Sequence, residues 1–252
     1  MAIPGIWWVD LQLDGVKRGT LADQPRERFP HPGSVIAANF SSPVDAIYLA
    51  AIFDPIFTVS YPETRRVQLV SLLGAVLAAL SPVRTAPPPN AKLVEIKDLL
   101  DSNPGQVIAV FPECGTTNGK AILPFSPSIL QTPADVHIFP VSIRYTPSDV
   151  TTPVPGKWFR FLWDLLSRPT TCIRVRIAEG QINTSAAKTN GVSSSTSGEL
   201  RQRNETSADV TAEEKRVLDR VGEALARLSR VKRVGLTMKD KAAFVNVLNN
   251  KR

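Results

Sequence analysis

The chain has 252 residues, of which 43% are hydrophobic and 21% are charged. These values are ordinary for a globular domain, so they exclude wholesale disorder and suffice for one substantial core or a core with a tail. The formal net charge of +7 favours an anionic partner, such as a lipid headgroup, a coenzyme A phosphate or nucleic acid, although a basic surface that only maintains solubility explains it equally well.

The first elements in chain order alternate between strands and helices. Residues 8–13 alternate as a strand that closes at Asp14-Gly15, and residues 34–38 form a short apolar run that predicts a buried strand. A helix is expected to begin at Pro43, with apolar residues at helical spacing behind it. Residues 64–80 predict a second helix, whose apolar part is too short to span a membrane.

The same alternation continues through the middle of the chain. Residues 91–100 predict a short amphipathic helix, and residues 107–111, 136–145 and 171–178 predict strands. Strands that alternate with helices predict an α/β fold, a largely parallel sheet flanked by helices. We assign residues 1–180 to this domain.

The last quarter of the chain divides into a polar segment and a helical extension. Residues 181–210 are rich in Ser, Thr and Asn and predict a disordered insertion, because they offer little apolar surface. Residues 211–252 predict C-terminal helices. The first begins at a capping box formed by Thr211 and Glu214, and the second follows Thr237.

Cysteine and histidine are scarce in this chain. Cys114 and Cys172 cannot form a disulfide framework and lack the spacing of metal ligands. His31 and His137 are the only histidines, so we predict no metal site. The lack of a disulfide framework indicates a reducing compartment. The N-terminal residues also lack the pattern of a secretory signal peptide.

Two segments about seventy residues apart resemble a known family. Residues 39–45 read Asn-Phe-Ser-Ser-Pro-Val-Asp, and residues 111–119 read Phe-Pro-Glu-Cys-Gly-Thr-Thr-Asn-Gly. They resemble the signatures Asn-His-x-Ser-x-x-Asp and Phe-Pro-Glu-Gly-Thr of the glycerolipid acyltransferases, the lysophosphatidic-acid-acyltransferase superfamily. The resemblance covers roughly residues 7–178. Phe40 stands where the family has its catalytic histidine.

The resemblance implies an activity and a set of site residues. It implies acyl transfer from acyl-CoA, as a co-substrate with no further cofactor, to a lysophospholipid. In the family the histidine takes the hydroxyl proton and the aspartate orients the imidazole, so Asp45 is the catalytic candidate beside a missing base. The implied substrate-binding residues are Ser41, Glu113, Gly115, Thr116, Thr117, Asn118 and Gly119. Both segments follow predicted strands, so we expect them to converge in one pocket.

The second segment and its surroundings depart from the family pattern. Cys114 replaces the usual glycine, and we interpret Gly115 as that glycine shifted by one position. The block that usually contains a phosphate-binding arginine is not recognisable, although Arg65 and Arg66 lie in that region. Membrane-bound members usually carry hydrophobic helices upstream, and we expect such a segment to be missing from this chain.

Each candidate also has a simpler interpretation. Asp45 is compatible with a first-turn carboxylate favoured by the helix dipole, and Glu113 with a surface turn. Cys114 fits an inert thiol better than a nucleophile, because no histidine is placed to serve it. Phe40 fits an apolar filler of the space left by an imidazole. Residues 158–166 are rich in Trp and Phe, which suits either a membrane interface or a helix packed on the core.

The leading hypothesis is a membrane-associated lysophospholipid acyltransferase with a lysophosphatidic-acid-like acceptor. The resemblance places it on the cytosolic face of the endoplasmic reticulum or on lipid droplets. The rival hypothesis is an inactive homologue that binds lipid or a protein partner. Nucleic acid is not an expected partner, because only the charge and the basic residues 216–233 suggest it.

Overall fold

Four strands, three of them short and apolar, form the parallel centre of the sheet. The computed structural model describes residues 6–17, 19–152, 154, 158–167, 171–189 and 210–250. The central strands lie in the order β8, β2, β6 and β3, all parallel, and the two innermost are completely buried. Burial on both faces explains why β2 and β6 are continuous apolar runs. The bounds are β2 (Val35–Ala38), β3 (Ile56–Val59), β6 (Ile108–Val110) and β8 (His137–Thr146).

Antiparallel pairs extend this centre on both sides. On one side β9 pairs antiparallel with β8, and β1 pairs parallel with β9. On the other side β4 and β5 add antiparallel strands beyond β3. The short strand β10 pairs antiparallel with the start of β8. The α/β fold with its mostly parallel core is therefore confirmed. These strands are β1 (Ile6–Leu13), β4 (Val67–Val70), β5 (Leu93–Val94), β9 (Thr171–Ile177) and β10 (Gln181–Ile182).

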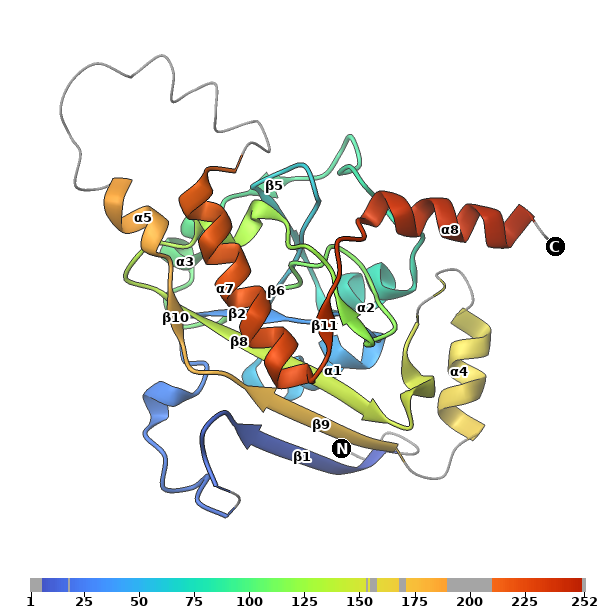
Figure 1. The fold of residues 1–252 in the computed structure, drawn as a ribbon, viewed down its shortest axis with the longest axis horizontal. Coiled ribbons are helices and arrows are strands. Elements are labelled where there is room, and N and C mark those ends of the chain that lie inside the picture. Colours follow the sequence, from blue (N-terminus) through green and yellow to red (C-terminus); the bar gives the residue numbers. More distant parts are fainter. Residues whose placement is uncertain are drawn as a thin grey trace.

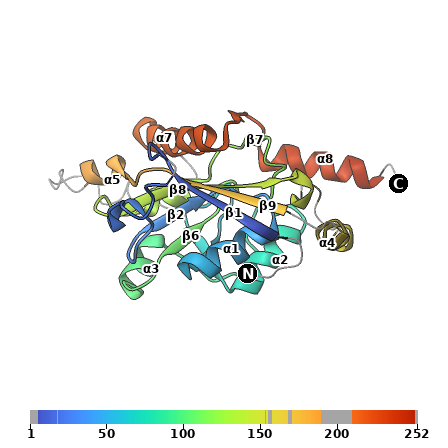
Figure 2. The same cartoon turned by 90° about the horizontal axis from the view of Figure 1, so that it is seen from below.

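Helices cover both faces of the sheet. Helices α1 (Pro43–Phe53) and α2 (Leu72–Leu80) lie on one face, and α7 (Ala212–Ser229) crosses the opposite face (Figures 1 and 2). Each face has its own apolar cluster, and α7 contributes Val217 and Val221 to the second. The remaining elements are η1 (Arg26–Arg28), α3 (Ile96–Ser102), β7 (Ala121–Ile122), η2 (Pro127–Gln131), η3 (Ser148–Val150), α4 (Trp158–Ser167), α5 (Thr184–Thr189), β11 (Lys232–Arg233) and α8 (Met238–Asn250).

The predicted helix over residues 64–80 is wrong in its first half. Residues Val67–Val70 form β4, and α2 begins only after Ser71, whose Oγ accepts a hydrogen bond of 3.2 Å from the Gly74 N–H. The edge of β3 supplies backbone partners that a local pattern does not reveal. The helix predicted over residues 91–100 likewise divides into β5 and α3.

Part of the predicted insertion belongs to the folded domain. Its first residues form β10 and α5, and the Asn183 side chain is buried and donates hydrogen bonds of 2.8 Å to the carbonyls of Leu130 and Thr132. The prediction of disorder is therefore wrong for residues 181–189. Its remainder, residues 190–209, lies outside the described residues.

Candidate active site

The first signature forms the turn between β2 and α1. Asn39 fastens this turn to the neighbouring strand, because its amide accepts from the Ile143 N–H at 2.7 Å and donates to the Ile143 carbonyl at 3.0 Å. Ser42 is the N-cap of α1 and Pro43 its first helical residue, a pairing that favours helix initiation. The expected helix start at Pro43 is confirmed.

The second signature follows β6, the strand beside β2. The Thr117 N–H donates a hydrogen bond of 2.8 Å to the Phe40 carbonyl, which joins the two signatures directly. Gly119 lies against Ser41, since a Cβ at this glycine would be 4.0 Å from the serine Cβ. The expected convergence of the two segments at the carboxyl ends of parallel strands is confirmed.

Asp45 is completely buried, and hydrogen bonds engage both of its carboxylate oxygens. Oδ2 accepts from the N–H groups of Ser41 at 2.7 Å and Ser42 at 2.9 Å, and from the Ser41 hydroxyl at 3.2 Å. Oδ1 accepts from the Tyr145 hydroxyl. Burial raises the pKa of Asp45 to about 6, although these donors oppose the rise. The carboxylate thus completes the capping box of α1, and its catalytic role stays a prediction.

Phe40 occupies an apolar position at the floor of the site. Its side chain is 4% exposed and stacks on Phe111, with ring centroids 4.2 Å apart and an interplanar angle of 23°. The chain's two histidines lie elsewhere. His137 begins β8 and packs near His31, so both imidazoles lie at the amino ends of the parallel strands, opposite the signatures. No imidazole of this chain therefore replaces the missing base.

Glu113 is a buried carboxyl rather than a surface turn residue. Its side chain is 1% exposed, and Oε2 accepts a long hydrogen bond of 3.3 Å from the Leu123 N–H. Oε1 has no hydrogen-bond partner within the part of the chain that the structure describes. Burial raises the pKa of Glu113 to about 8, so the neutral acid predominates at neutral pH.

Cys114 adopts the left-handed backbone conformation that favours glycine. Its φ is 61°, whereas Gly115 is not in this region, so the interpretation that the family glycine has shifted by one position is wrong. Burial raises the pKa of the Cys114 thiol to about 12. A thiol with this pKa is protonated at neutral pH and is a poor nucleophile, which agrees with the simpler interpretation of this residue.

The other residues of the second signature serve different parts of the site. Thr116 is buried and donates a hydrogen bond of 2.9 Å to the Thr152 carbonyl, and Asn118 is exposed and caps its own turn by accepting from the Lys120 N–H at 3.0 Å. Among the predicted substrate-binding residues, Gly115 and Thr116 line a cavity next to the signatures.

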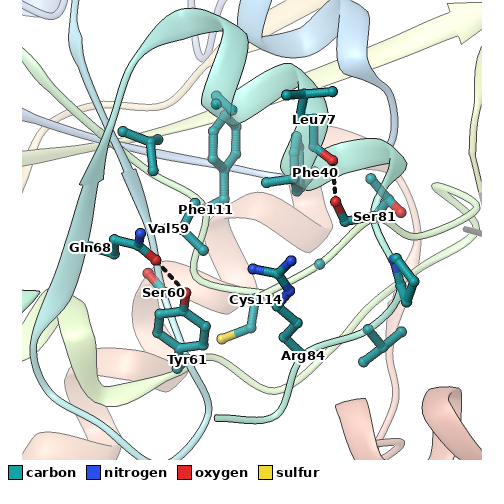
Figure 3. A pocket seen from close by; sticks show the side chains of 18 of the residues that line it. Phe40, Val59, Ser60, Tyr61, Gln68, Leu77, Ser81, Arg84, Phe111 and Cys114 are labelled. Atoms are coloured by element: carbon teal, nitrogen blue, oxygen red, sulfur yellow. Dashed lines mark hydrogen bonds between the residues drawn. The ribbon is translucent and has the colours of Figure 1, made fainter. Parts of the chain in front are cut away.

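This cavity has a volume of about 390 Å³ and lies between α2, the end of β3 and the second signature (Figure 3). Phe40 and Phe111 form part of its wall, together with aliphatic side chains of β3, β4 and α2. Two cationic residues that the sequence analysis did not single out, Arg84 and Lys241, also line it. No local motif marks either residue.

Arg65 and Arg66, which lie in the region of the family's phosphate-binding block, have other partners. Arg65 donates to Glu214 of α7 at 2.6 Å, and Arg66 donates to Glu95 at 3.2 Å. Neither arginine lines the cavity. Both therefore hold surface segments together, and Arg65 connects the β4 edge to α7.

Two comparisons relate this site to known proteins. Residues 22–144 match the family model described as Acyltransferase. A protein of Schizosaccharomyces pombe named "Putative lysophosphatidic acid:oleoyl-CoA acyltransferase" is 32% identical to the chain over 130 residues. This alignment covers 50% of the chain and 42% of that relative's length. The residues that match the family model include both signatures and exclude α8.

Proposed function

Because the chain belongs to the glycerolipid acyltransferase superfamily, we propose that it transfers the acyl group of an acyl-CoA to the hydroxyl of a lysophospholipid. The observation that carries this proposal is the junction of the two signatures, made by the Thr117–Phe40 hydrogen bond beside the cavity. The S. pombe relative, named for lysophosphatidic acid and oleoyl-CoA, supports a similar pair of substrates.

The proposed reaction forms an ester and releases coenzyme A. The acceptor hydroxyl attacks the thioester carbonyl, the C–O bond forms, the C–S bond breaks, and the hydroxyl proton ends on the leaving thiolate. The apolar wall of the cavity, with Phe40 and Phe111, suits a hydrocarbon chain and excludes water. Phe40 accepts no proton, so the reaction at this site proceeds without a positioned imidazole.

Turnover is therefore expected to be measurable but slow. A positioned general base typically contributes about 10²–10⁴-fold to the rate. This chain lacks that contribution, because Phe40 stands in place of the histidine. The test incubates the purified chain with radiolabelled oleoyl-CoA and a panel of lysophospholipids and resolves the products by thin-layer chromatography. Labelled phospholipid above the enzyme-free control is the expected result. Its absence for every acceptor contradicts the proposed function and favours the inactive homologue.

We also propose that the protein works at a membrane surface, through α4. The buried side chains Phe161 and Leu165 fasten this peripheral helix to the domain (Figure 1). Its other side exposes large apolar residues, which are Trp158, Phe159, Leu162, Trp163 and Leu166. Aromatic side chains are favoured at the membrane interface, and the net positive charge favours anionic lipid. The cytosolic face of the endoplasmic reticulum or lipid droplets suits this arrangement. Among the described residues, no helix has both the length and the apolar character needed to cross a bilayer.

Substituting Trp158→Ala and Trp163→Ala together should weaken co-sedimentation with anionic vesicles by about tenfold or more, because each ring withdraws apolar area from water. The matched control is Trp8→Ala, which removes a ring that is 72% exposed on β1. Added salt should release the wild type, since surface charges are screened. Equal losses in the control and the α4 variant would disprove a specific role for α4.

A further inference from the structure

The two edges of the main sheet differ in their protection against other chains. At one edge, β5 has only two residues and follows three consecutive prolines at positions 87–89. At the other edge, β1 has eight residues and contains neither proline nor lysine (Figure 1). Short strands, prolines and lysines are the usual features that keep a sheet edge from pairing with another chain. The β1 edge has none of them.

The backbone of β1 presents hydrogen-bonding groups on its outer side. The Asp14 N–H donates to the Ile177 carbonyl of β9 at 2.9 Å, which shows that the backbone of Asp14 faces β9. Because the backbone groups of successive residues in a strand point to opposite sides, Asp10 also faces β9, whereas Val9 and Leu11 face outward. Within the described part of the chain, Val9 and Leu11 form no backbone hydrogen bond beyond the β1–β9 pairing, and no strand pairs with the outer side of β1.

The strand also exposes apolar side chains on both of its faces. Val9 is 49% exposed, and Trp8, which points to the opposite face, is 72% exposed. The only charged side chain of the strand, Asp10, pairs with Arg174 of the neighbouring β9 at 3.2 Å. An edge that combines unpaired backbone groups with exposed apolar side chains is a site for the addition of another strand.

We propose that β1 is a dimerisation edge, on which the β1 strand of a second copy of this chain pairs in the antiparallel direction. A two-fold axis perpendicular to the sheet relates identical edges in this direction, so that both copies contribute the same residues. The outward-facing groups of Val9 and Leu11 then form hydrogen bonds that join the two sheets into one. This inference is independent of the proposed acyl transfer, since no residue of β1 belongs to either signature or lines the cavity.

The sequence of β1 selects one register for this pair. Antiparallel pairing sets outward-facing residues opposite each other, so the two registers with the longest overlap are centred on Val9 and on Asp10. The register centred on Asp10 brings two carboxylates opposite each other, and like charges in that position are destabilising. The register centred on Val9 sets the two valines opposite each other and Asp10 opposite Trp8 of the second copy. The edge is complementary to itself in this register, which is why a second copy is the expected occupant.

The dimer is expected to be weak and to become tighter with added salt. A single pair of strands buries less surface than a standard protein interface, so we expect a dissociation constant on the order of 10–100 μM. The formal net charge of +7 on each copy opposes association, and salt screens this repulsion. The measurement is sedimentation equilibrium of the full chain in about 0.05 M and about 0.5 M sodium chloride. The dimer fraction should rise with both the protein and the salt concentration.

Charge substitutions at position 9 test both the surface and the register. Val9→Lys and Val9→Glu each place two like charges opposite each other at the two-fold axis, and each should weaken the dimer by about tenfold. An equimolar mixture of the two variants should recover the dimer, because every lysine then lies opposite a glutamate. This recovery is specific to a register centred on position 9.

The matched control is Leu69→Lys, which changes a residue that is 50% exposed on β4, a strand with partners on both sides. It should leave the dimer unchanged, and far-UV circular dichroism verifies that every variant is folded. A wild type that stays monomeric in high salt overturns the proposal and favours a strand of a different protein as the occupant. A dimer that both Val9 variants leave intact, or a mixture that is no tighter than either variant alone, also overturns it.

Discussion

Replacing Phe40 by histidine and Tyr145 by phenylalanine in one variant should raise acyl transfer by roughly 10²–10⁴-fold over the wild type. Histidine at position 40 restores a proton acceptor at the family's position. An imidazole acts as a base only when its other nitrogen has an acceptor that fixes the tautomer. The Tyr145 hydroxyl donates a hydrogen bond to Oδ1 of Asp45, whereas Oδ2 accepts several hydrogen bonds from the first signature. Tyr145→Phe removes this single donor, so that Oδ1 can accept a hydrogen bond from the imidazole. The measurement is the initial rate of phospholipid formation at saturating oleoyl-CoA.

Three matched variants test this explanation. Phe40→His alone should increase the rate much less, since the Tyr145 hydroxyl still donates its hydrogen bond to Asp45. Phe40→Gln in the Tyr145→Phe background adds a polar side chain of similar reach without a base, and it should gain nothing. Adding Asp45→Asn to the double variant should remove the gain. A rate increase of the same size with glutamine at position 40 would show that polarity or space, not a general base, limits the wild type.

Asp45→Ala should lower the free energy of unfolding by about 3 kcal/mol or more. The change leaves the N–H groups of Ser41 and Ser42 and the Tyr145 hydroxyl without their acceptor in the protein interior, and each such group costs about 1–3 kcal/mol. Loss of the cap on α1 adds to this cost. Urea unfolding at pH 7 measures the difference. Asp54→Asn, at the exposed other end of α1, should change stability by less than about 0.5 kcal/mol.

The pH dependence of stability separates the charge of Asp45 from its hydrogen bonds. Its folded pKa of about 6 lies above the ordinary 3.8, so the folded state binds this proton more tightly than the unfolded state. The stabilisation by protonation is fully present below about pH 4 and is lost as the pH rises through 6. When the pH is lowered from 7 to 4, the free energy of unfolding of the wild type should therefore rise by roughly 2 kcal/mol relative to that of Asp45→Asn. If the difference in unfolding free energy between the two proteins does not change with pH, burial does not raise the pKa of Asp45.

These stability effects decide how an inactive Asp45 variant should be interpreted. The carboxylate holds the first signature and the start of α1, so its removal disturbs the site whether or not it takes part in the chemistry. A loss of activity in Asp45→Ala therefore says little about catalysis. The Asp45→Asn change in the Phe40→His, Tyr145→Phe background is more informative, because it removes a measured gain.

Local chemistry in the sequence determined the helix starts and the two signature turns. Helices α1 and α7 both begin with a capping box, formed by Ser42 with Asp45 and by Thr211 with Glu214. In a capping box, two residues three positions apart each accept a hydrogen bond from the other's backbone N–H, so the motif forms without distant parts of the fold. The short apolar runs of β2 and β6, each bounded by turn residues, indicated the buried centre of the sheet, since strands buried on both faces are continuous apolar runs.

Tertiary structure alone decided the elements and residues whose partners are distant in the chain. Residues 67–70 became β4 because β3 offers backbone partners, and an apolar run has the same composition in a buried helix. Asn183 became part of the core through the carbonyls of η2 and the residue after it. Tyr145 contacts Asp45 across a sequence separation of 100 residues, and Lys241 contacts Thr116 across 125. Such contacts leave no periodic trace in the sequence, because they depend on where folded elements meet and not on the spacing of residues along one element.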